Sequence, residues 1–139
     1  MGQDIRKRLN ILVMVGFFIV ILFIIVKGEK GIELKVGENG LTISAASGEP
    51  LYVDYEKIRN ISFVQDFERG ERVSGPEKRG ISAGTWKNEQ YQEYTLFAYD
   101  KIPSVIILET DGGAIAFNYE SKNTTEEFYV TLKDYLNKR

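Results

Sequence analysis

The chain carries few of the residue types on which enzymes usually depend. Its 139 residues include no cysteine and no histidine, which excludes thiolate chemistry, disulfides and the usual general base near neutral pH. Ser74 or Ser82 could be paired with Lys78 as a nucleophile and base, but no surrounding motif supports such a pair. Asp111 precedes two glycines, where an aspartate bonds its own turn before it binds a metal. We therefore predict a non-enzymatic protein without catalytic residues, cofactor or metal site.

Residues 66–80 are the best candidates for a binding surface. They contain three glycines, one proline and many charges of both signs, which predicts a long exposed loop. Such a loop can be solvated and without function, but loops on a rigid scaffold also carry binding sites. Arginine and tryptophan dominate many interfaces, although a tryptophan in a small β-domain is often part of the core. The predicted partner-binding residues are Phe67, Arg69, Arg72, Arg79 and Trp86.

Residues 9–26 form an apolar run without a charge. As a helix this run would extend roughly 27 Å, close to the thickness of the hydrocarbon core of a bilayer. The sequence therefore predicts a transmembrane helix, a lipid bilayer as its partner and a single-pass membrane localisation. The basic residues 6–8 favour a cytoplasmic N-terminus. Lys27, Lys30 and Lys35 on the other flank nearly cancel that preference.

Composition limits what the remaining part of the chain can bind. The chain has 18 basic and 20 acidic residues. Three of the basic residues and one acidic residue precede Lys27, so the remainder has a net charge of −4. A mildly acidic domain is a poor partner for nucleic acid or for anionic lipid. The predicted organisation is a basic flank (1–8), a transmembrane helix (9–26), a linker (27–30) and one domain (31–139).

Hydrophobic periodicity predicts a mainly β domain. About seven short runs alternate between apolar and polar residues, which is the period of a half-buried strand. Asn39-Gly40 and Asp111-Gly112-Gly113 predict tight hairpin turns. The last segment differs, because an N-cap at Asn123 or Thr124 precedes an apolar stripe at helical spacing. These elements predict a sheet curled into a barrel or sandwich, with one amphipathic C-terminal helix against its open end.

Several segments resemble the bacterial pleckstrin-homology-like (PH-like) domain family over residues 35–137. They are Tyr52–Ile61, Arg79-Gly80, Gly84–Asn88, Tyr91, Tyr94–Phe97, Val105–Leu108, Ile115–Asn118 and the helix through Thr124, Phe128 and Leu132. The resemblance implies a seven-strand barrel capped by the C-terminal helix and placed beside a membrane segment. Relatives that bind phosphoinositides carry clustered Lys and Arg around the first hairpin. Here one Lys35 stands beside Glu33 and Glu38, so no phosphoinositide is expected.

Three functions remain open on the sequence alone. The first is a membrane-anchored, non-enzymatic PH-like scaffold that recognises a protein or peptide at the membrane. The second is a structural or regulatory subunit of a larger membrane complex that acts through the transmembrane helix. A more remote alternative is the binding of lipid head groups. Neither nucleic acid nor phosphoinositide is an expected partner.

Overall fold

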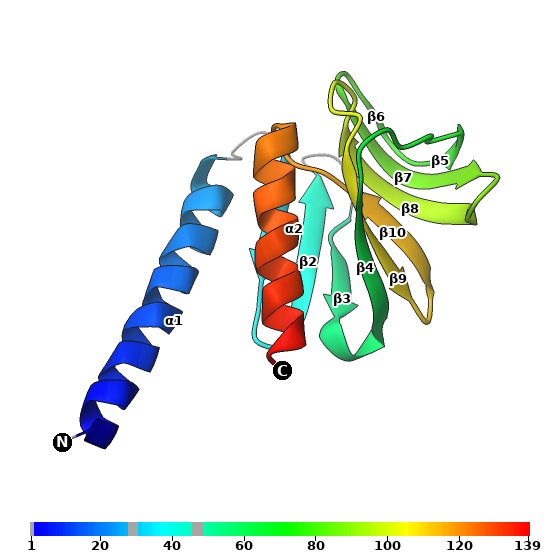
Figure 1. Ribbon diagram of the computed structural model, residues 1–139. Helices are drawn as coiled ribbons and strands as arrows, with labels where there is room; N and C mark the ends of the chain where they lie inside the picture. Colours follow the sequence, from blue (N-terminus) through cyan, green and yellow to red (C-terminus); the bar gives the residue numbers. More distant parts are fainter. Residues whose placement is uncertain (1, 28–30, 46–48) are drawn as a thin grey trace.

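The computed structural model describes residues 2–27, 31–45 and 49–139, except for the side chains of 15–27 and 77–78. The described residues form two β-sheets and a C-terminal helix, α2 (Lys122–Asn137), whose apolar residues join one core with both sheets. Figure 1 shows α2 alongside the first sheet and β4. The mainly β class and the C-terminal helix that the sequence predicts are both confirmed.

The first sheet has three antiparallel strands in the order β1-β2-β3. Its strands are β1 (Ile32–Val36), β2 (Gly40–Ala45) and β3 (Leu51–Asp54). Leu34 pairs with Ile43 and Leu41 with Val53, and all four side chains are buried. The alternating pattern therefore places one apolar face of this sheet toward the core, as predicted.

The second sheet has seven strands and follows a short 3-10 helix, η1 (Tyr55–Lys57). Its order is β4-β9-β10-β8-β7-β5, and β6 pairs with β7. The pair β8–β10 is parallel, whereas the other pairs are antiparallel. The strands are β4 (Ile58–Val64), β5 (Glu71–Ser74), β6 (Glu77–Lys78), β7 (Ile81–Asn88), β8 (Gln92–Tyr99), β9 (Val105–Thr110) and β10 (Gly113–Phe117).

The prediction of a closed seven-strand barrel is wrong. Among the described residues, the two sheets do not pair with one another, and β4 and β5 end the second sheet with one neighbour each. The physical reason is that stacking already buries the apolar face. The first sheet and α2 together cover one side of the second sheet, so the core is complete without a closed ring of hydrogen bonds.

Strand β9 shows that the second sheet is covered on both faces. Its residues Val105, Ile106, Ile107 and Leu108 are all buried, although consecutive residues of a strand point to opposite faces. Ile106 and Leu108 belong to the core shared with the first sheet and α2. Val105 and Ile107 belong to a second cluster on the outer face, which is the face turned away from the first sheet.

Helix α2 is fixed by a cap and by two buried side chains. Its N-cap is Ser121 rather than Asn123 or Thr124, and Thr124 completes a capping box with it. Ser121 Oγ accepts a hydrogen bond from the Thr124 N–H at 3.1 Å. Phe128 and Leu132, one turn apart, are both buried in the shared core, as their spacing predicts.

The predicted membrane span falls within helix α1 (Gly2–Lys27). Within the described residues, no helix has the length and apolar character needed to cross a membrane. The described side chains of α1 end at residue 14 and include Asp4 and the basic residues 6–8. The rest of the predicted span, 15–26, lies outside the described side chains. The predictions of a transmembrane helix and of a single-pass membrane localisation are therefore wrong on this finding.

Candidate functional site

The five residues predicted to bind a partner do not form one surface. Arg72, Arg79 and Trp86 line the same hollow on the second sheet. Arg69 is instead bound into the fold by hydrogen bonds, and Phe67 packs in an aromatic cluster. The structure therefore keeps three of the five residues as candidates and gives the other two a structural role.

Arg69 holds the connection between β8 and β9. Its guanidinium donates to Asp100 Oδ1 at 2.7 Å and to the carbonyl oxygens of Tyr99 and Ile102 at 2.8 and 3.1 Å. Its side chain is only 17% exposed. Because these hydrogen bonds hold the Arg69 guanidinium within the fold, few of its donors are left to contact a partner.

Phe67 lies against two tyrosines on the outer face of the second sheet. Its ring centroid is 5.6 Å from that of Tyr94, edge to face, and 6.5 Å from that of Tyr91. The Tyr94 hydroxyl donates to the Arg69 carbonyl at 2.6 Å, and burial raises the pKa of Tyr94 to about 12. Phe67 and Tyr94 therefore anchor the segment between β4 and β5 onto the sheet.

Residues 66–80, predicted as an exposed loop, contain the strands β5 and β6. Both strands pair with β7, and a bend separates them where the backbone passes close to β7. Gly75 and Gly84 face one another at the bend with φ of 128° and 126°. A Cβ on Gly84 would collide with the Ser74 carbonyl, and a Cβ on Gly75 with the Ala83 carbonyl. The two glycines therefore allow the close crossing that separates β5 from β6.

This bend brings Arg72, Arg79 and Trp86 around one hollow of about 530 Å³, which we call the arginine hollow. Arg72 on β5 pairs in register with Trp86 on β7, and Arg79 lies in the turn between β6 and β7. Both arginines are exposed, while Trp86 is half-buried. The other described lining residues are Pro76, Gly80, Ile81, Ser82 and Asp100.

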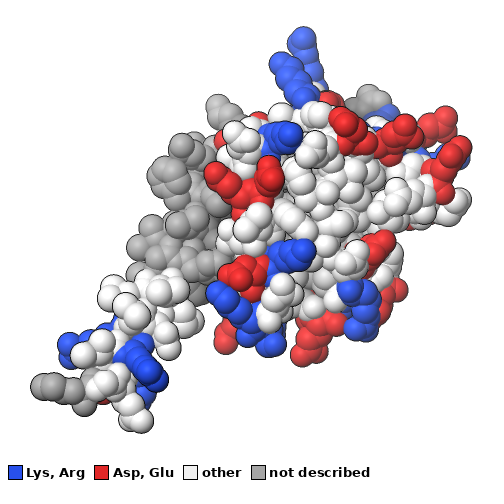
Figure 2. All heavy atoms as spheres, in the orientation of Figure 1, with Lys and Arg blue, Asp and Glu red and all other residues white. Residues whose placement is uncertain are grey.

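The described lining of the arginine hollow has an excess of positive charge. Its carboxylate, Asp100, accepts hydrogen bonds from the Arg69 guanidinium at 2.7 Å and the Ser82 hydroxyl at 2.6 Å. Arg69 balances the charge of Asp100, and Arg72 and Arg79 are the other charged residues of the described lining. Figure 2 shows that positive and negative side chains are interspersed over the visible face of the molecule.

Trp86 supplies the apolar wall of the hollow. It packs against the outer-face cluster, and its indole Nε1 is buried without a hydrogen-bond partner among the described residues. The sequence offered two interpretations of this residue, core or contact. In the structure Trp86 is both, because part of its ring packs on the sheet while the residue also lines the hollow.

Two of the residues considered for catalysis, Ser82 and Asp111, have structural roles. The Ser82 hydroxyl donates to Asp100, and the Lys78 side chain lies outside the described residues. Asp111, in the turn between β9 and β10, forms an exposed ion pair with Arg59 at 2.7 Å. The hydrogen bond from Arg59 lowers the pKa of Asp111. Among the described side chains, no three acidic residues lie where they could hold a metal ion together.

Comparison of the chain with protein-family models, curated proteins and solved structures gave no match. The arginine hollow gathers three of the five predicted partner-binding residues. Two exposed guanidinium groups and an aromatic wall are suited to bind a carboxylate next to an apolar group.

Proposed function

We propose that this chain is a non-enzymatic binding module that recognises an acidic segment of a protein partner in the arginine hollow. The observation that supports this proposal is the convergence of Arg72, Arg79 and Trp86 around a single concave surface. The resemblance to bacterial PH-like domains remains a prediction and is compatible with a binding role.

The chemistry of the hollow favours an acidic segment over a neutral one. Arginine binds carboxylates through paired N–H donors, and such hydrogen bonds are stronger than neutral ones. Trp86 and Pro76 offer an apolar surface next to these donors. A segment that alternates acidic and aliphatic residues would use both kinds of contact.

The exposed edge of the second sheet leaves room for such a segment. All four residues of β5 are exposed, and β5 pairs only with β7 in the part of the chain that the structure describes. Outward-facing backbone groups on an edge strand can bind an extended peptide. Glu71 and Arg72 on this edge carry charge, which disfavours uncontrolled pairing with other chains.

Tryptophan fluorescence tests the proposal directly, because Trp86 is the only tryptophan in the chain. The full chain would be titrated with the peptide acetyl-Glu-Leu-Glu-Leu-Glu-amide and with its lysine counterpart. We expect a saturable change in Trp86 emission with the acidic peptide that weakens as salt is added. The double variant Arg72→Glu/Arg79→Glu should raise the Kd of the acidic peptide about tenfold or more.

The matched control is Lys35→Glu/Lys122→Glu, which makes the same charge change at exposed positions outside the hollow. This control should bind the acidic peptide as the parent does. The proposal is wrong if the lysine peptide changes the emission equally, or if both double variants behave alike.

A further inference from the structure

A second concave site lies between β4 and the last turns of α2, on elements that do not contribute to the arginine hollow. We call it the β4–α2 cleft. Its volume is about 550 Å³, within the range of roughly 300–1,000 Å³ typical of small-molecule sites. Its lining residues are Tyr55, Glu56, Ile58, Arg59, Asn60, Ile61, Lys133, Leu136, Asn137 and Arg139.

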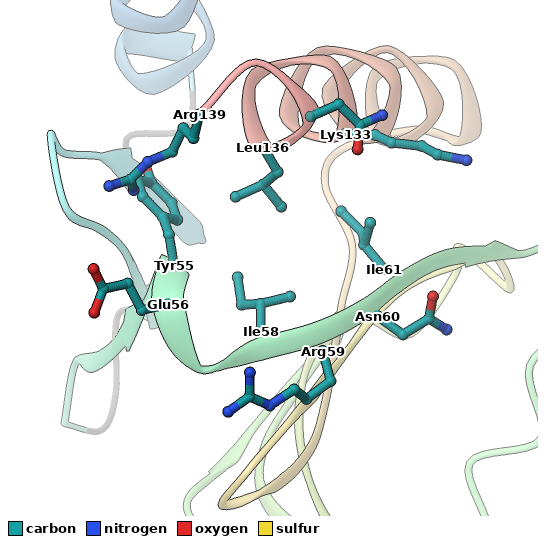
Figure 3. Close-up of a pocket in the computed structure, with 10 residues that line it drawn as sticks. Tyr55, Glu56, Ile58, Arg59, Asn60, Ile61, Lys133, Leu136 and Arg139 are labelled. Atoms are coloured by element: carbon teal, nitrogen blue, oxygen red, sulfur yellow. The ribbon is translucent and has the colours of Figure 1, made fainter.

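The walls of the cleft are aliphatic because of a bulge in β4. Ile58 pairs with Thr110 and Ile61 with Leu108 on β9, so one extra residue lies between them on β4. A regular strand would point Ile58 and Ile61 to opposite faces, whereas the bulge turns both toward α2. Figure 3 shows Ile58 and Ile61 rising from β4 while Leu136 reaches from α2 toward them. All three side chains are only partly buried.

Aromatic contacts flank the cleft on two sides. The Phe63 and Tyr129 rings stack at 5.8 Å between β4 and α2. On the other side, the ring centroids of Tyr55 and Tyr135 lie 5.5 Å apart, edge to face. The Arg139 guanidinium carbon lies 5.0 Å from the centroid of the Tyr55 ring. Because side chains join β4 or η1 to α2 at both places, the cleft suits a compact ligand better than an extended peptide passing through it.

The polar rim of the cleft is positive on its α2 side. Lys133 and Arg139 border it, and Lys133 Nζ donates to the Tyr129 hydroxyl at 3.2 Å. The positive charges of Lys133 and Arg139 exceed the negative partial charge of roughly one half at the C-terminus of α2. In Figure 3 Arg59 points away from the cleft, consistent with its ion pair to Asp111, and Glu56 also points outward.

From these features we propose that the β4–α2 cleft binds a small amphiphile with one carboxylate and an aliphatic tail. The tail lies among Ile58, Ile61 and Leu136, and the carboxylate lies at one end of the cleft beside Lys133 or Arg139, whose side chains point to opposite ends of it (Figure 3). Burial of the tail supplies most of the driving force, while the two cations select the sign of the head group.

Octanoate is the probe, and methyl NMR of the full chain is the measurement. We expect octanoate, below its micelle-forming concentration, to shift the methyl signals of Ile58, Ile61 and Leu136 saturably. The methyl signals of Leu96, which is buried on the outer face of the second sheet, should not move. Octylammonium, with the same tail and opposite charge, should bind about tenfold more weakly.

Two variants locate the site. Lys133→Glu/Arg139→Glu changes only exposed residues and should raise the Kd of octanoate about tenfold, unlike the control Lys35→Glu/Lys122→Glu. Leu136→Glu should abolish the shifts, whereas Val130→Glu, which places the same charge on an exposed position of α2, should not.

Three kinds of outcome would overturn the proposal. The first is the absence of saturable shifts at the three cleft residues with octanoate. The second is equal binding of octylammonium, or an unchanged Kd in the Lys133→Glu/Arg139→Glu variant. The third is tighter binding at the cleft by the peptide acetyl-Glu-Leu-Glu-Leu-Glu-amide than by octanoate, which would assign the cleft to a peptide instead.

Discussion

At the scale of single residues, Arg69 shows how one side chain can be misread from sequence. An arginine in a charged, glycine-rich segment is typical of an exposed contact residue. In the structure its donors are used by Asp100 and by two carbonyl groups, all 30 or more positions along the chain. Nothing within the segment 66–80 indicates these partners, because they lie on the connection between β8 and β9.

Replacing Arg69 should therefore destabilise the fold. Arg69→Ala removes three hydrogen bonds, one of them to a carboxylate, from a side chain that is 17% exposed. We expect the free energy of unfolding to fall by about 2 kcal/mol, measured by urea denaturation. The matched control is Arg59→Ala, which breaks an ion pair exposed on both sides and should cost much less. Equal losses in the two variants would contradict the structural role of Arg69.

The two glycines of the bend mark another limit of sequence reading at this scale. Gly75 and Gly84 are both needed because each backbone occupies the space where the other would carry a Cβ. They are separated by eight other residues, and only the pairing of β5 and β6 with β7 makes them neighbours. The arginine hollow depends on this crossing, so the sequence could propose Arg72, Arg79 and Trp86 but not the concave surface that they line.

At the scale of elements, the sequence predicts best where periodicity and burial agree. The alternation in β1 and β2 and the apolar stripe of α2 are confirmed. The strand β5 is not predicted because all four of its residues are exposed. Its sequence therefore lacks the alternation of apolar and polar residues that indicates a half-buried strand. Its conformation follows from hydrogen bonding to β7, which is information held elsewhere in the chain.

The contribution of α2 to the core can be measured by truncating its two buried side chains. Phe128 and Leu132 are each 2% exposed, and the Phe128 ring lies 6.1 Å from that of Phe117 on β10. We expect Phe128→Ala and Leu132→Ala each to lower the free energy of unfolding by about 2–5 kcal/mol. Val130→Ala is the control, because Val130 is 59% exposed and should change stability by less than about 0.5 kcal/mol. Neutral effects of both core variants would show that α2 is detached from the sheets in solution.

At the scale of the whole molecule, the division of the strands into two separate sheets was the least predictable feature. Short alternating strands and a final helix fit either a closed barrel or two stacked sheets. The choice depends on pairings between distant segments, such as the parallel contact of β8 with β10. The buried Asn118 side chain supports that arrangement, because it bonds the Tyr99 N–H at 2.7 Å and the Ile102 carbonyl at 2.9 Å. No local pattern in the sequence encodes such a contact.

The packing of the whole molecule also makes a prediction about alkaline pH. Burial raises the pKa of five of the eight tyrosines. For Tyr94 and Tyr119 the pKa rises to about 12, whereas a tyrosine in an unfolded chain ionises near pH 10. The folded state thus keeps these protons to higher pH than the unfolded state does. Their contribution to stability is complete below about pH 10 and is lost as the pH rises toward about 12.

We therefore expect the urea midpoint to fall as the pH rises above about 10, in parallel with phenolate absorbance. The variant Tyr94→Phe separates this effect from the titration of lysines. Near pH 8 it should be less stable than the parent by about 1 kcal/mol, because the hydrogen bond to the Arg69 carbonyl is lost. Above about pH 10 the difference should shrink, since phenylalanine has no proton to lose. If Tyr94 and Tyr119 of the folded chain ionise near pH 10, these two tyrosines are not packed as the structure shows.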